Sequence, residues 1–331
     1  MSELRQDLVS GDWIIMAPER AKRPHDLIAK NKVRREPTPK SECPFEDFEK
    51  SGNWPPIASS PDTKNWKAVI IPNKYPALRH ADECAEVATK GPYQFHDGIG
   101  QHDLVVTRDH TKNIAHMTVA EAVRVFELLQ KHYRTLAKDK CLLYVSTFFN
   151  WGISAGASLY HPHFQVLSLP IIPPDIGHSL NGSREYFEKH GKCVHCEMLA
   201  YEAKWEKRII EQNKGAVAAT PYVSRDPFEI RLYPKSHRPY FEKTPLSELR
   251  GIVAALQSSL RRIEKYLRDP DLNFFIHTAP LKNQGLYGHY HWHIEILPKF
   301  SISAGFELGT GVDIDVVDPD AAAAILRGER I

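Results

Sequence analysis

The chain has 331 residues, more than a single hydrophobic core usually serves, so two domains are expected. Its charged side chains almost cancel to a net charge of +2, which argues against nucleic acid or an anionic membrane as the main partner. No apolar run reaches the length of a membrane span and the first residues lack the core of a signal peptide, so a cytoplasmic location is expected.

The first half of the chain is predicted to contain strands around one long helix. Residues 1–40 are rich in Arg, Lys and Pro, and we expect extended and loop structure there. A helix is predicted over residues 117–138, because Thr118 and Glu121 fit a capping box and apolar residues recur at helical spacing behind them. The predicted strands of this half cover residues 65–73, 102–110, 141–150 and 163–170.

The same order of elements returns in the second half. Segment 169–177 is rich in Pro and interrupts the pattern, so we place a boundary there between an N-terminal domain, 1–175, and a C-terminal domain, 176–331. A second long helix is predicted to have Thr244 as its N-cap and Pro245 at its first position. The predicted strands of this half cover residues 227–237, 272–280 and 289–300.

The two halves place their histidines at matching positions, which indicates an internal duplication. Superposing the patterns pairs His110 with His237, His161 with His291, and His163 with His293. The intervals agree closely, at 51 residues from His110 to His161 and 54 from His237 to His291. Each half is therefore predicted to be an α+β unit with antiparallel strands, one long crossover helix and a last strand that carries histidines.

The second half contains a complete set of candidate zinc ligands. Cys193 and Cys196 form a CxxC pattern, which in a reducing compartment indicates metal or redox chemistry. The duplication adds His237 and His291, which completes a Cys2His2 set of the kind that structural zinc uses. The alternative is a pair of buried or redox-active thiols.

The first half should then hold a corresponding set. Its members are Cys43, Glu46, His110 and His161, with a carboxylate where a second thiolate would be expected. A carboxylate oxygen can bind zinc, although such a mixed set is harder than one with two thiolates. The alternative is that Glu46 is a solvated loop residue and that this site is empty.

The remaining cysteines fit no such pattern. The chain has five cysteines, an odd number, which argues against a disulfide framework. Cys84 is left without a role, and Cys141, at the start of a predicted strand, is expected in the core.

His163 is the candidate nucleophile if His161 faces a metal. A neutral imidazole is a competent nucleophile near pH 7, and phosphoryl groups are natural targets for it. Gln165 can donate an amide N–H to a phosphoryl oxygen, whereas the second copy has Glu295 after His293, and a carboxylate would repel phosphate. The first copy is thus predicted to be catalytic and the second structural. The alternative is that His163 is another ligand or an ordinary strand-end residue.

Two further stretches suit a nucleotide. A basic loop could clamp phosphate, and a Gly-rich loop before the histidines could bring backbone close to phosphate or ribose. The alternatives are a solvated basic loop and a plain flexible turn; neither stretch is a Walker A loop or a dinucleotide-binding fingerprint. The candidate residues are Arg20, Lys22 and Arg23 in the first stretch, and Asn150, Gly156 and Ser158 in the second.

The stretch "HPHFQ", residues 161–165, resembles the HPHxQ active-site motif of galactose-1-phosphate uridylyltransferases, a branch of the histidine triad superfamily. The resemblance covers most of the chain, and it implies a fold of two tandem histidine-triad-like domains. Further matching segments, in order along the chain, are "LRQDLVSGDWIIMAPERAKRP", "IPNKYPAL", "GQHDLVVTRDH", "FNWGISAGASLYHPHFQ" and "GFELGTG".

The resemblance implies a ping-pong reaction on nucleotide-sugar and sugar-1-phosphate substrates. His163 would attack the α-phosphorus of UDP-glucose and expel glucose-1-phosphate, leaving a uridylyl-histidine held by Gln165; galactose-1-phosphate would then accept the uridylyl group. The resemblance also implies structural zinc, one or two ions per chain, a homodimer, and nucleotide or sugar contacts from Asn73, Gly309 and Thr310.

The chain departs from the family pattern in two places. The usual CPFC is CPFE here, which puts the first metal site in question, and Phe164 stands inside the motif where small residues are common. Related ADP-glucose phosphorylases use an adenylylated histidine with phosphate as acceptor, and no residue identified here separates uracil from adenine. His102 and His277 match histidines in family-like strands without an assigned role.

Overall fold

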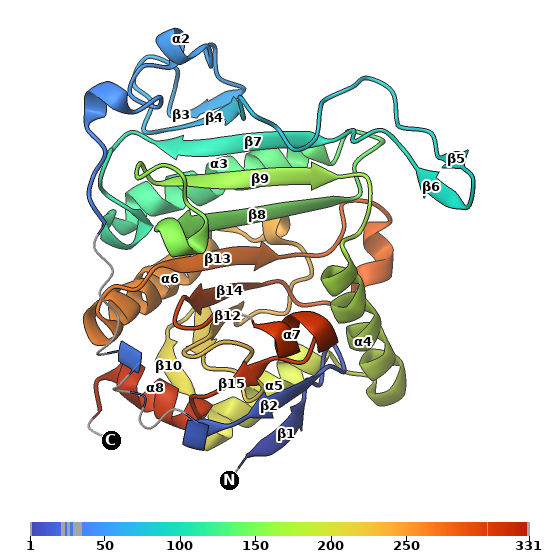
Figure 1. Cartoon of the computed structure of the whole chain (residues 1–331), viewed down its shortest axis with the longest axis vertical. Coiled ribbons are helices and arrows are strands. Elements are labelled where there is room, and N and C mark those ends of the chain that lie inside the picture. The colour runs from blue at the N-terminus through green and yellow to red at the C-terminus, as the bar shows by residue number, and fades with distance from the viewer. Residues whose placement is uncertain (1, 21–23, 25–26, 29–34, 303, 330–331) are drawn as a thin grey trace.

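The computed structural model describes residues 2–20, 24, 27–28, 35–302 and 304–329. Its centre is an antiparallel sheet of ten strands, seen face-on in Figure 1. The strand order is β10 (Ile209–Gln212), β11 (Ala216–Ala219), β12 (Ile230–Pro234), β14 (His293–Pro298), β13 (Leu272–His277), β8 (Tyr144–Trp151), β9 (His163–Leu169), β7 (Gln101–Thr107), β4 (Ala68–Pro72) and β3 (Ala58–Ser60).

This order is mirrored about the centre of the sheet. From β8 the strands run outward as β9, β7, β4 and β3, and from β13 they run outward as β14, β12, β11 and β10. β8 and β13 pair directly, with Phe149 opposite Phe274, so one sheet passes through both halves. The predicted α+β fold is confirmed, and the mirrored order is what a duplicated unit produces.

Two long helices, α3 (Val119–Leu136) and α6 (Leu246–Leu267), lie on the same face of the sheet, behind it in Figure 1. The predicted capping box begins α3: Glu121 N–H donates to Thr118 Oγ1, and the Glu121 carboxylate accepts from Thr118 N–H. The predicted start of α6 is wrong by one residue. Pro245 is the N-cap, and Thr244 Oγ1 instead accepts from the Trp292 indole N–H at 2.9 Å.

Each long helix contributes a buried glutamine that bonds to the backbone segment just before the other helix. Gln130 on α3 donates to the carbonyl oxygens of Phe241 and Thr244, and Gln257 on α6 donates to those of Ile114 and Met117, all at 2.8–2.9 Å. Hydrogen bonds from these uncharged amides satisfy backbone carbonyl groups that would otherwise be buried without partners. The reciprocal arrangement repeats the duplication at the level of single side chains.

The N-terminal strands lie against the C-terminal half of the molecule. β1 (Glu3–Gln6) and β2 (Trp13–Met16) form a small sheet with β15 (Ile314–Asp315), and Arg231 of β12 forms an ion pair with Asp7. Further helices of the described residues are α2 (Phe48–Ser51), α4 (Pro174–His190), α5 (Val194–Trp205), α7 (Gly305–Thr310) and α8 (Pro319–Arg327). The division at residues 175 and 176 falls inside α4 and stays a prediction.

A disulfide joins Cys84 to Cys141, so the expectations for these two residues are wrong. Cys84 is exposed and Cys141 is only half-buried, not in the core. The bond connects the arm that carries the β5 (Ala88–Lys90) and β6 (Tyr93–Phe95) hairpin, which projects at the right of Figure 1, to the segment before β8. The odd number of cysteines did not reveal this disulfide, because two of the five are bonded and the other three are free.

Among the described helices, none is both long and apolar enough to cross a membrane.

Candidate active site and metal centres

His163 and Gln165 lie on the face of the sheet opposite to the long helices. Side chains alternate along β9, and Phe164, between the two, is buried with its ring 5.9 Å from that of Phe126 on α3. The bulky residue inside the motif is therefore a core residue. Its burial directs His163 and Gln165 to the open face, where His163 keeps 7% of its surface exposed.

The hydrogen bond of His163 sets its tautomer. Its Nδ1 lies 2.9 Å from the carbonyl oxygen of His161, and since a carbonyl only accepts, Nδ1 carries the proton. Nε2 is then left with its lone pair. Burial lowers the pKa of His163, which keeps the ring neutral and nucleophilic near pH 7.

The two histidines of the motif have different surroundings. His161 turns its Nδ1 toward Cys43 Sγ at 3.5 Å, whereas His163 begins β9. The ring of Phe45 lies edge-on to both, with centroid distances of 5.5 Å to His161 and 5.3 Å to His163. His161 therefore faces the candidate metal ligands, and Phe45 packs against both rings.

The four predicted ligands of the first site come together. Cys43, His110 and His161 offer donor atoms within 4.8 Å of one another, and Glu46 Oε1 lies 3.1 Å from Nδ1 of His110 and 3.6 Å from Nδ1 of His161. Each histidine donates its Nε2–H to a backbone carbonyl at 2.7 Å, that of Thr38 for His110 and that of Thr107 for His161. Both Nδ1 lone pairs are thereby left for the centre.

Two atoms of this first site fit a cation. Glu46 Oε1 and His110 Nδ1 are buried and have no hydrogen-bond partner among the described residues. A buried acceptor without a partner is costly, and a metal ion would satisfy both atoms. Burial raises the pKa of the Cys43 thiol, so the thiol keeps its proton in the absence of a metal. A cation that binds the sulfur would displace this proton. The Glu46 side chain is 28% exposed, but its Oε1 is buried beside the two histidines, and its role as a ligand stays a prediction.

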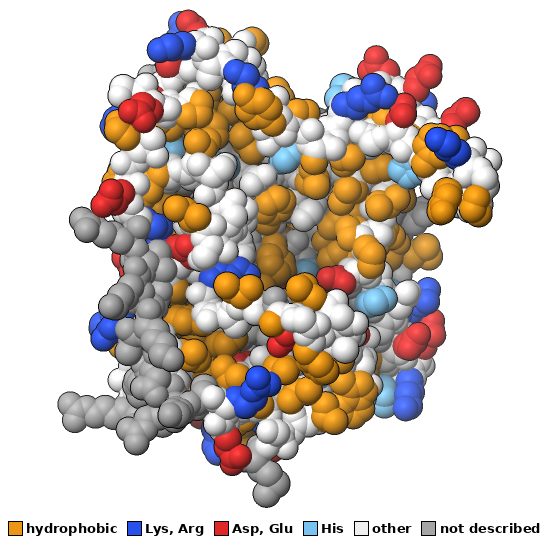
Figure 2. Space-filling model, in the orientation of Figure 1, with side chains coloured by type: hydrophobic (Ala, Val, Ile, Leu, Met, Phe, Trp, Pro, Cys, Tyr) orange, Lys and Arg blue, Asp and Glu red, His pale blue; other side chains and the backbone are white. Residues whose placement is uncertain are grey.

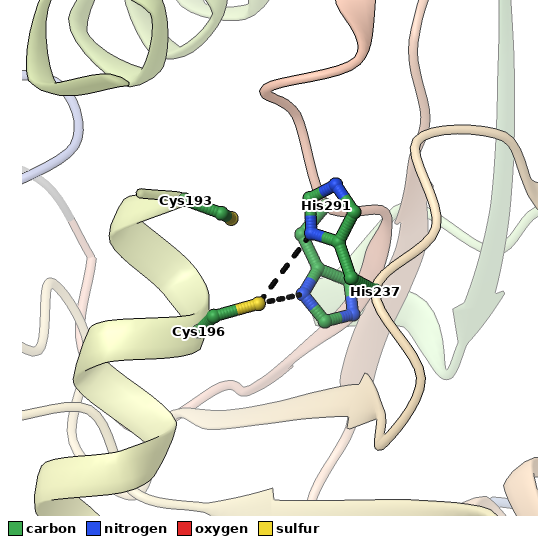
Figure 3. Close-up of side chains that lie close together, drawn as sticks. All are labelled: Cys193, Cys196, His237 and His291. Atoms are coloured by element: carbon green, nitrogen blue, oxygen red, sulfur yellow. Dashed lines mark hydrogen bonds between the residues drawn. The ribbon is translucent and has the colours of Figure 1, made fainter. Parts of the chain in front are cut away.

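The second site gathers all four of its predicted ligands. Donor atoms of Cys193, Cys196, His237 and His291 lie within 4.8 Å of one another, and Figure 3 shows Cys196 Sγ facing both imidazoles. Cys196 Sγ is 3.4 Å from His237 Nδ1 and 3.6 Å from His291 Nδ1. Hydrogen bonds from Cys196, and after it from His237 and His291, lower the pKa of Cys193, which favours its thiolate.

The histidines of the second site are held as in the first. His237 Nε2–H donates to the carbonyl oxygen of Gly288 at 2.8 Å, and His291 Nε2–H donates to that of Pro234 at 3.1 Å. Thiolate sulfur and neutral imidazole nitrogen are the donors that zinc prefers, so both sets of residues fit this ion.

Sequence reasoning missed a third group, on the C-terminal copy of the open face. His277, His293 and Glu295 offer donor atoms within 4.8 Å, beside a cavity of about 250 Å³. Burial alone would raise the pKa of Glu295, but the charges of Arg231, His277 and Arg225 and a hydrogen bond from His277 together outweigh it and hold the pKa at about 2. Glu229 also pairs with Arg231 at 2.7 Å. The spacing of His293 and Glu295 was visible in the sequence, but the pairing with Arg231 was not.

Gln165 belongs to a small amide network in the first copy. Its Oε1 lies 3.0 Å from His102 Nε2, and Asn73 Nδ2 lies 3.1 Å from the same nitrogen. Asn73 follows β4 and bonds through its backbone N–H to the carbonyl oxygen of His102. The structure thus brings one predicted nucleotide-binding residue, Asn73, and the predicted catalytic Gln165 to the same nitrogen of a histidine that had no assigned role.

The Gly-rich loop between β8 and β9 is anchored by Asp271. Its carboxylate accepts from Ser154 N–H at 2.8 Å and from Arg35 at 2.7 Å. Gly152 has a φ of +90°, and a Cβ there would lie 1.7 Å from Asp271 Oδ1, so only glycine fits. Asn150 is held by Asn273, which donates to its Oδ1 at 2.8 Å. Gly156 and Ser158 are exposed on this loop.

Like the predicted residues of the Gly-rich loop, three further predicted nucleotide- or sugar-binding residues are not joined to His163 or Gln165 by a hydrogen bond in the described structure. Arg20 lies exposed in a short 3-10 helix, Pro18–Arg20. Gly309 and Thr310 lie exposed at the end of α7, in front of the C-terminal half (Figure 1). Lys22 and Arg23 lie outside the described residues.

The open face is hollowed between the projecting arm and α7, and Figure 2 shows hydrophobic side chains and histidines along this hollow. The arm and α7 carry exposed apolar side chains, including Tyr75, Tyr93 and Leu308, with exposed fractions of 81%, 73% and 77%. Apolar surface beside polar groups is typical of ligand and partner sites.

Comparison with known proteins identifies relatives over the whole chain. Residues 1–173 match the model described as galactose-1-phosphate uridyl transferase, N-terminal domain. An ADP-glucose phosphorylase of Arabidopsis thaliana is 34% identical over 98% of this chain and 92% of its own. A galactose-1-phosphate uridylyltransferase of Thermotoga maritima is 26% identical over 100% of this chain and 99% of its own.

Solved structures give the same two kinds of relative. The crystal structure of an ADP-glucose phosphorylase from Arabidopsis thaliana with bound ADP-glucose has a TM-score of 0.84 and 31% identity over 100% of both chains. A uridylyltransferase structure has a TM-score of 0.75 and 26% identity, over 99% of this chain and 98% of that one.

Proposed function

Because this chain belongs to the galactose-1-phosphate uridylyltransferase family, we propose that it transfers a nucleotidyl group between sugar phosphates through a covalent intermediate on His163. The observation that carries the proposal is the hydrogen bond from His163 Nδ1–H to the His161 carbonyl, which leaves Nε2 as the nucleophilic atom. The neutral, buried ring needs no base to remove a proton before it attacks.

The reaction takes two balanced steps. Nε2 of His163 attacks the α-phosphorus of a nucleoside diphosphate hexose; a P–N bond forms, and the bond to the bridging oxygen breaks, releasing hexose-1-phosphate. An oxygen of the acceptor phosphate then attacks the same phosphorus, and the P–N bond breaks to restore the neutral ring. Gln165 donates an amide N–H to the phosphoryl oxygens, which carry more negative charge in each transition state.

Two nucleotide donors fit this chemistry. The family model and the Thermotoga relative support the expected transfer of a uridylyl group from UDP-glucose to galactose-1-phosphate. The greater identity to the ADP-glucose phosphorylase supports the alternative, transfer of an adenylyl group from ADP-glucose to phosphate. The chemistry on His163 is the same in both, and only the pocket for the base and the acceptor differ.

Zinc would have a structural role in both centres. The ion held by Cys43, Glu46, His110 and His161 would fix the loop that packs against the nucleophile, and the ion held by the Cys2His2 set would fix the start of α5. Asn73, Asn150 and Ser158 are the proposed phosphate or ribose contacts on the described open face. The exposed residues of α7, with Gly309 and Thr310, would complete the site across a homodimer.

The test is incubation of the protein with UDP-glucose and, separately, with ADP-glucose, followed by intact-mass analysis. A uridylyl adduct supports the first donor, and an adenylyl adduct alone supports the second. Either adduct should be absent in His163→Ala and present in His178→Ala, which removes an exposed histidine of α4. No adduct with either donor would contradict the proposed function.

A further inference from the structure

We propose that His102 is a positioning residue that orients the amide of Gln165 so that its NH2 group, rather than its oxygen, faces the phosphoryl group. This inference rests on the proposed function and adds a role for a residue outside the HPHFQ motif. His102 lies on β7, one strand away from the nucleophile, and its side chain is on the same open face as Gln165.

The tautomer of His102 follows from a backbone contact. The N–H of Ala77 points at His102 Nδ1 with a distance of 3.1 Å. A backbone N–H can only donate, so Nδ1 must accept and carries no proton. In a neutral imidazole the proton is then on Nε2.

The position of that proton decides the orientation of Gln165. His102 Nε2 lies 3.0 Å from Gln165 Oε1, so Nε2–H donates and the amide oxygen accepts. The reverse orientation would place the NH2 group of Gln165 against an N–H, two donors facing each other. The NH2 group of Gln165 is therefore the end of the amide that is left to bond elsewhere.

Asn73 is oriented by the same histidine. Its Oδ1 accepts from Tyr75 N–H at 3.0 Å, which fixes the direction of the amide and brings Nδ2 to 3.1 Å from His102 Nε2. The backbone N–H of Ala77 and the NH2 group of Asn73 cannot both donate to a neutral His102, which has one acceptor nitrogen. The backbone N–H is fixed in place and takes Nδ1, so the NH2 group of Asn73 has to turn from the protonated Nε2 to another acceptor. Two amide NH2 groups, of Asn73 and Gln165, are thus prepared as donors around one imidazole.

Phosphoryl oxygens only accept hydrogen bonds, so this arrangement matches the substrate. A Gln165 amide in the opposite orientation would present its oxygen to the phosphate and repel it. The second copy lacks this device. Arg231 pairs with Glu295 in the same register as Leu104 with Gln165, so Glu229 stands where His102 does and pairs with Arg231 instead.

Two substitutions test separately the donor role of His102 Nε2 and the acceptor role of His102 Nδ1. His102→Gln places an amide nitrogen near the former Nε2 and keeps a donor for Gln165. His102→Asn keeps an acceptor for the N–H of Ala77 but is too short to donate to Gln165. The measurements are the single-turnover rate of adduct formation on His163, the dissociation constant of the sugar nucleotide and the melting temperature of each variant.

The expected result is a loss of about 10- to 100-fold in the rate of His102→Asn, as is typical when a supporting hydrogen bond is removed. His102→Gln should stay within a few-fold of the wild type, and both variants should melt at similar temperatures. Nitrogen-15 NMR of the unmodified protein should show the proton of His102 on Nε2.

Each failure has a separate reading. A proton on Nδ1 of His102 overturns the positioning role whatever the activity is. Adduct formation by wild type and by His102→Asn at equal rates overturns the positioning role and leaves the proposed function standing. Equal losses of rate and of melting temperature in both variants show a merely structural histidine. No adduct in the wild type overturns the proposed function and this inference together.

Discussion

The ring of Phe45 lies edge-on to the imidazole of His163, with centroids 5.3 Å apart, and Phe45 stands between the metal-ligand candidates Cys43 and Glu46. A metal ion in the first site would therefore fix the position of Phe45, which packs against the nucleophile. The same loop brings ligands to one side of His161 and an aromatic edge to His163, which connects ion binding to the geometry of catalysis.

Phe45→Ala should lower the rate of adduct formation and destabilise the protein by about 3 kcal/mol, because it removes a buried aromatic ring that packs on His163. The matched control is Phe48→Ala, which removes a ring of the same small cluster that stacks on Trp54 instead. The control should lose comparable stability and keep its rate. Urea unfolding and single-turnover kinetics measure both quantities, and equal rate losses would contradict a specific role of Phe45.

Metal analysis of the purified protein should find two zinc ions per chain. Glu46→Ala should retain one, because the buried nitrogens of His110 and His161 lose their carboxylate neighbour. Cys193→Ser should also retain one, the ion of the first site. Glu49→Ala, an exposed carboxylate on α2, should retain both. A single ion in the unmodified protein that survives Glu46→Ala would show that the first site is empty.

Reduction of the Cys84–Cys141 disulfide should destabilise the protein by about 4 kcal/mol at most, since the bond closes a loop with a sequence separation of 57 residues. Chemical unfolding in the presence and absence of dithiothreitol measures the difference. The double variant Cys84→Ser, Cys141→Ser should have the stability of the reduced wild type, with or without dithiothreitol. This control also separates the disulfide from any effect of the reductant on the zinc thiolates, which would appear in the double variant as well.

Asp315→Asn should remove a pH dependence of stability. Burial raises the pKa of Asp315 from 3.8 to about 7, so the folded protein binds this proton more tightly than the unfolded chain does. The stability that this group contributes is present below pH 3.8 and is lost as the pH rises through 7. Relative to Asp315→Asn, the wild type should lose up to about 1.4 kcal/mol for each pH unit in that window. Unfolding free energies at a series of pH values check this, and parallel curves for the two proteins would contradict it.

The strands and helices around the site could be predicted because their signals are local. The capping box of Thr118 and Glu121 lies within four residues, and the alternation of β9 follows from the pleat of any strand. The ends of elements were harder to predict. Thr244 is a good N-cap in isolation, but Trp292, distant in the sequence, takes its hydroxyl group.

The sequence by itself determined which chemical groups are present and in what order: the duplicated histidines, the CxxC pair and the HPHFQ motif. The tertiary structure decided how those groups are presented. The proton on His163 is set by a carbonyl within its own motif, but the orientation of Gln165 depends on Ala77 and His102, and Glu46 meets His110 and His161 only in the folded chain. Cys84 likewise finds Cys141 across a long loop. Hydrogen bonds and ion contacts act over a few ångströms in space, so residues far apart in the chain decide them and no local pattern encodes them.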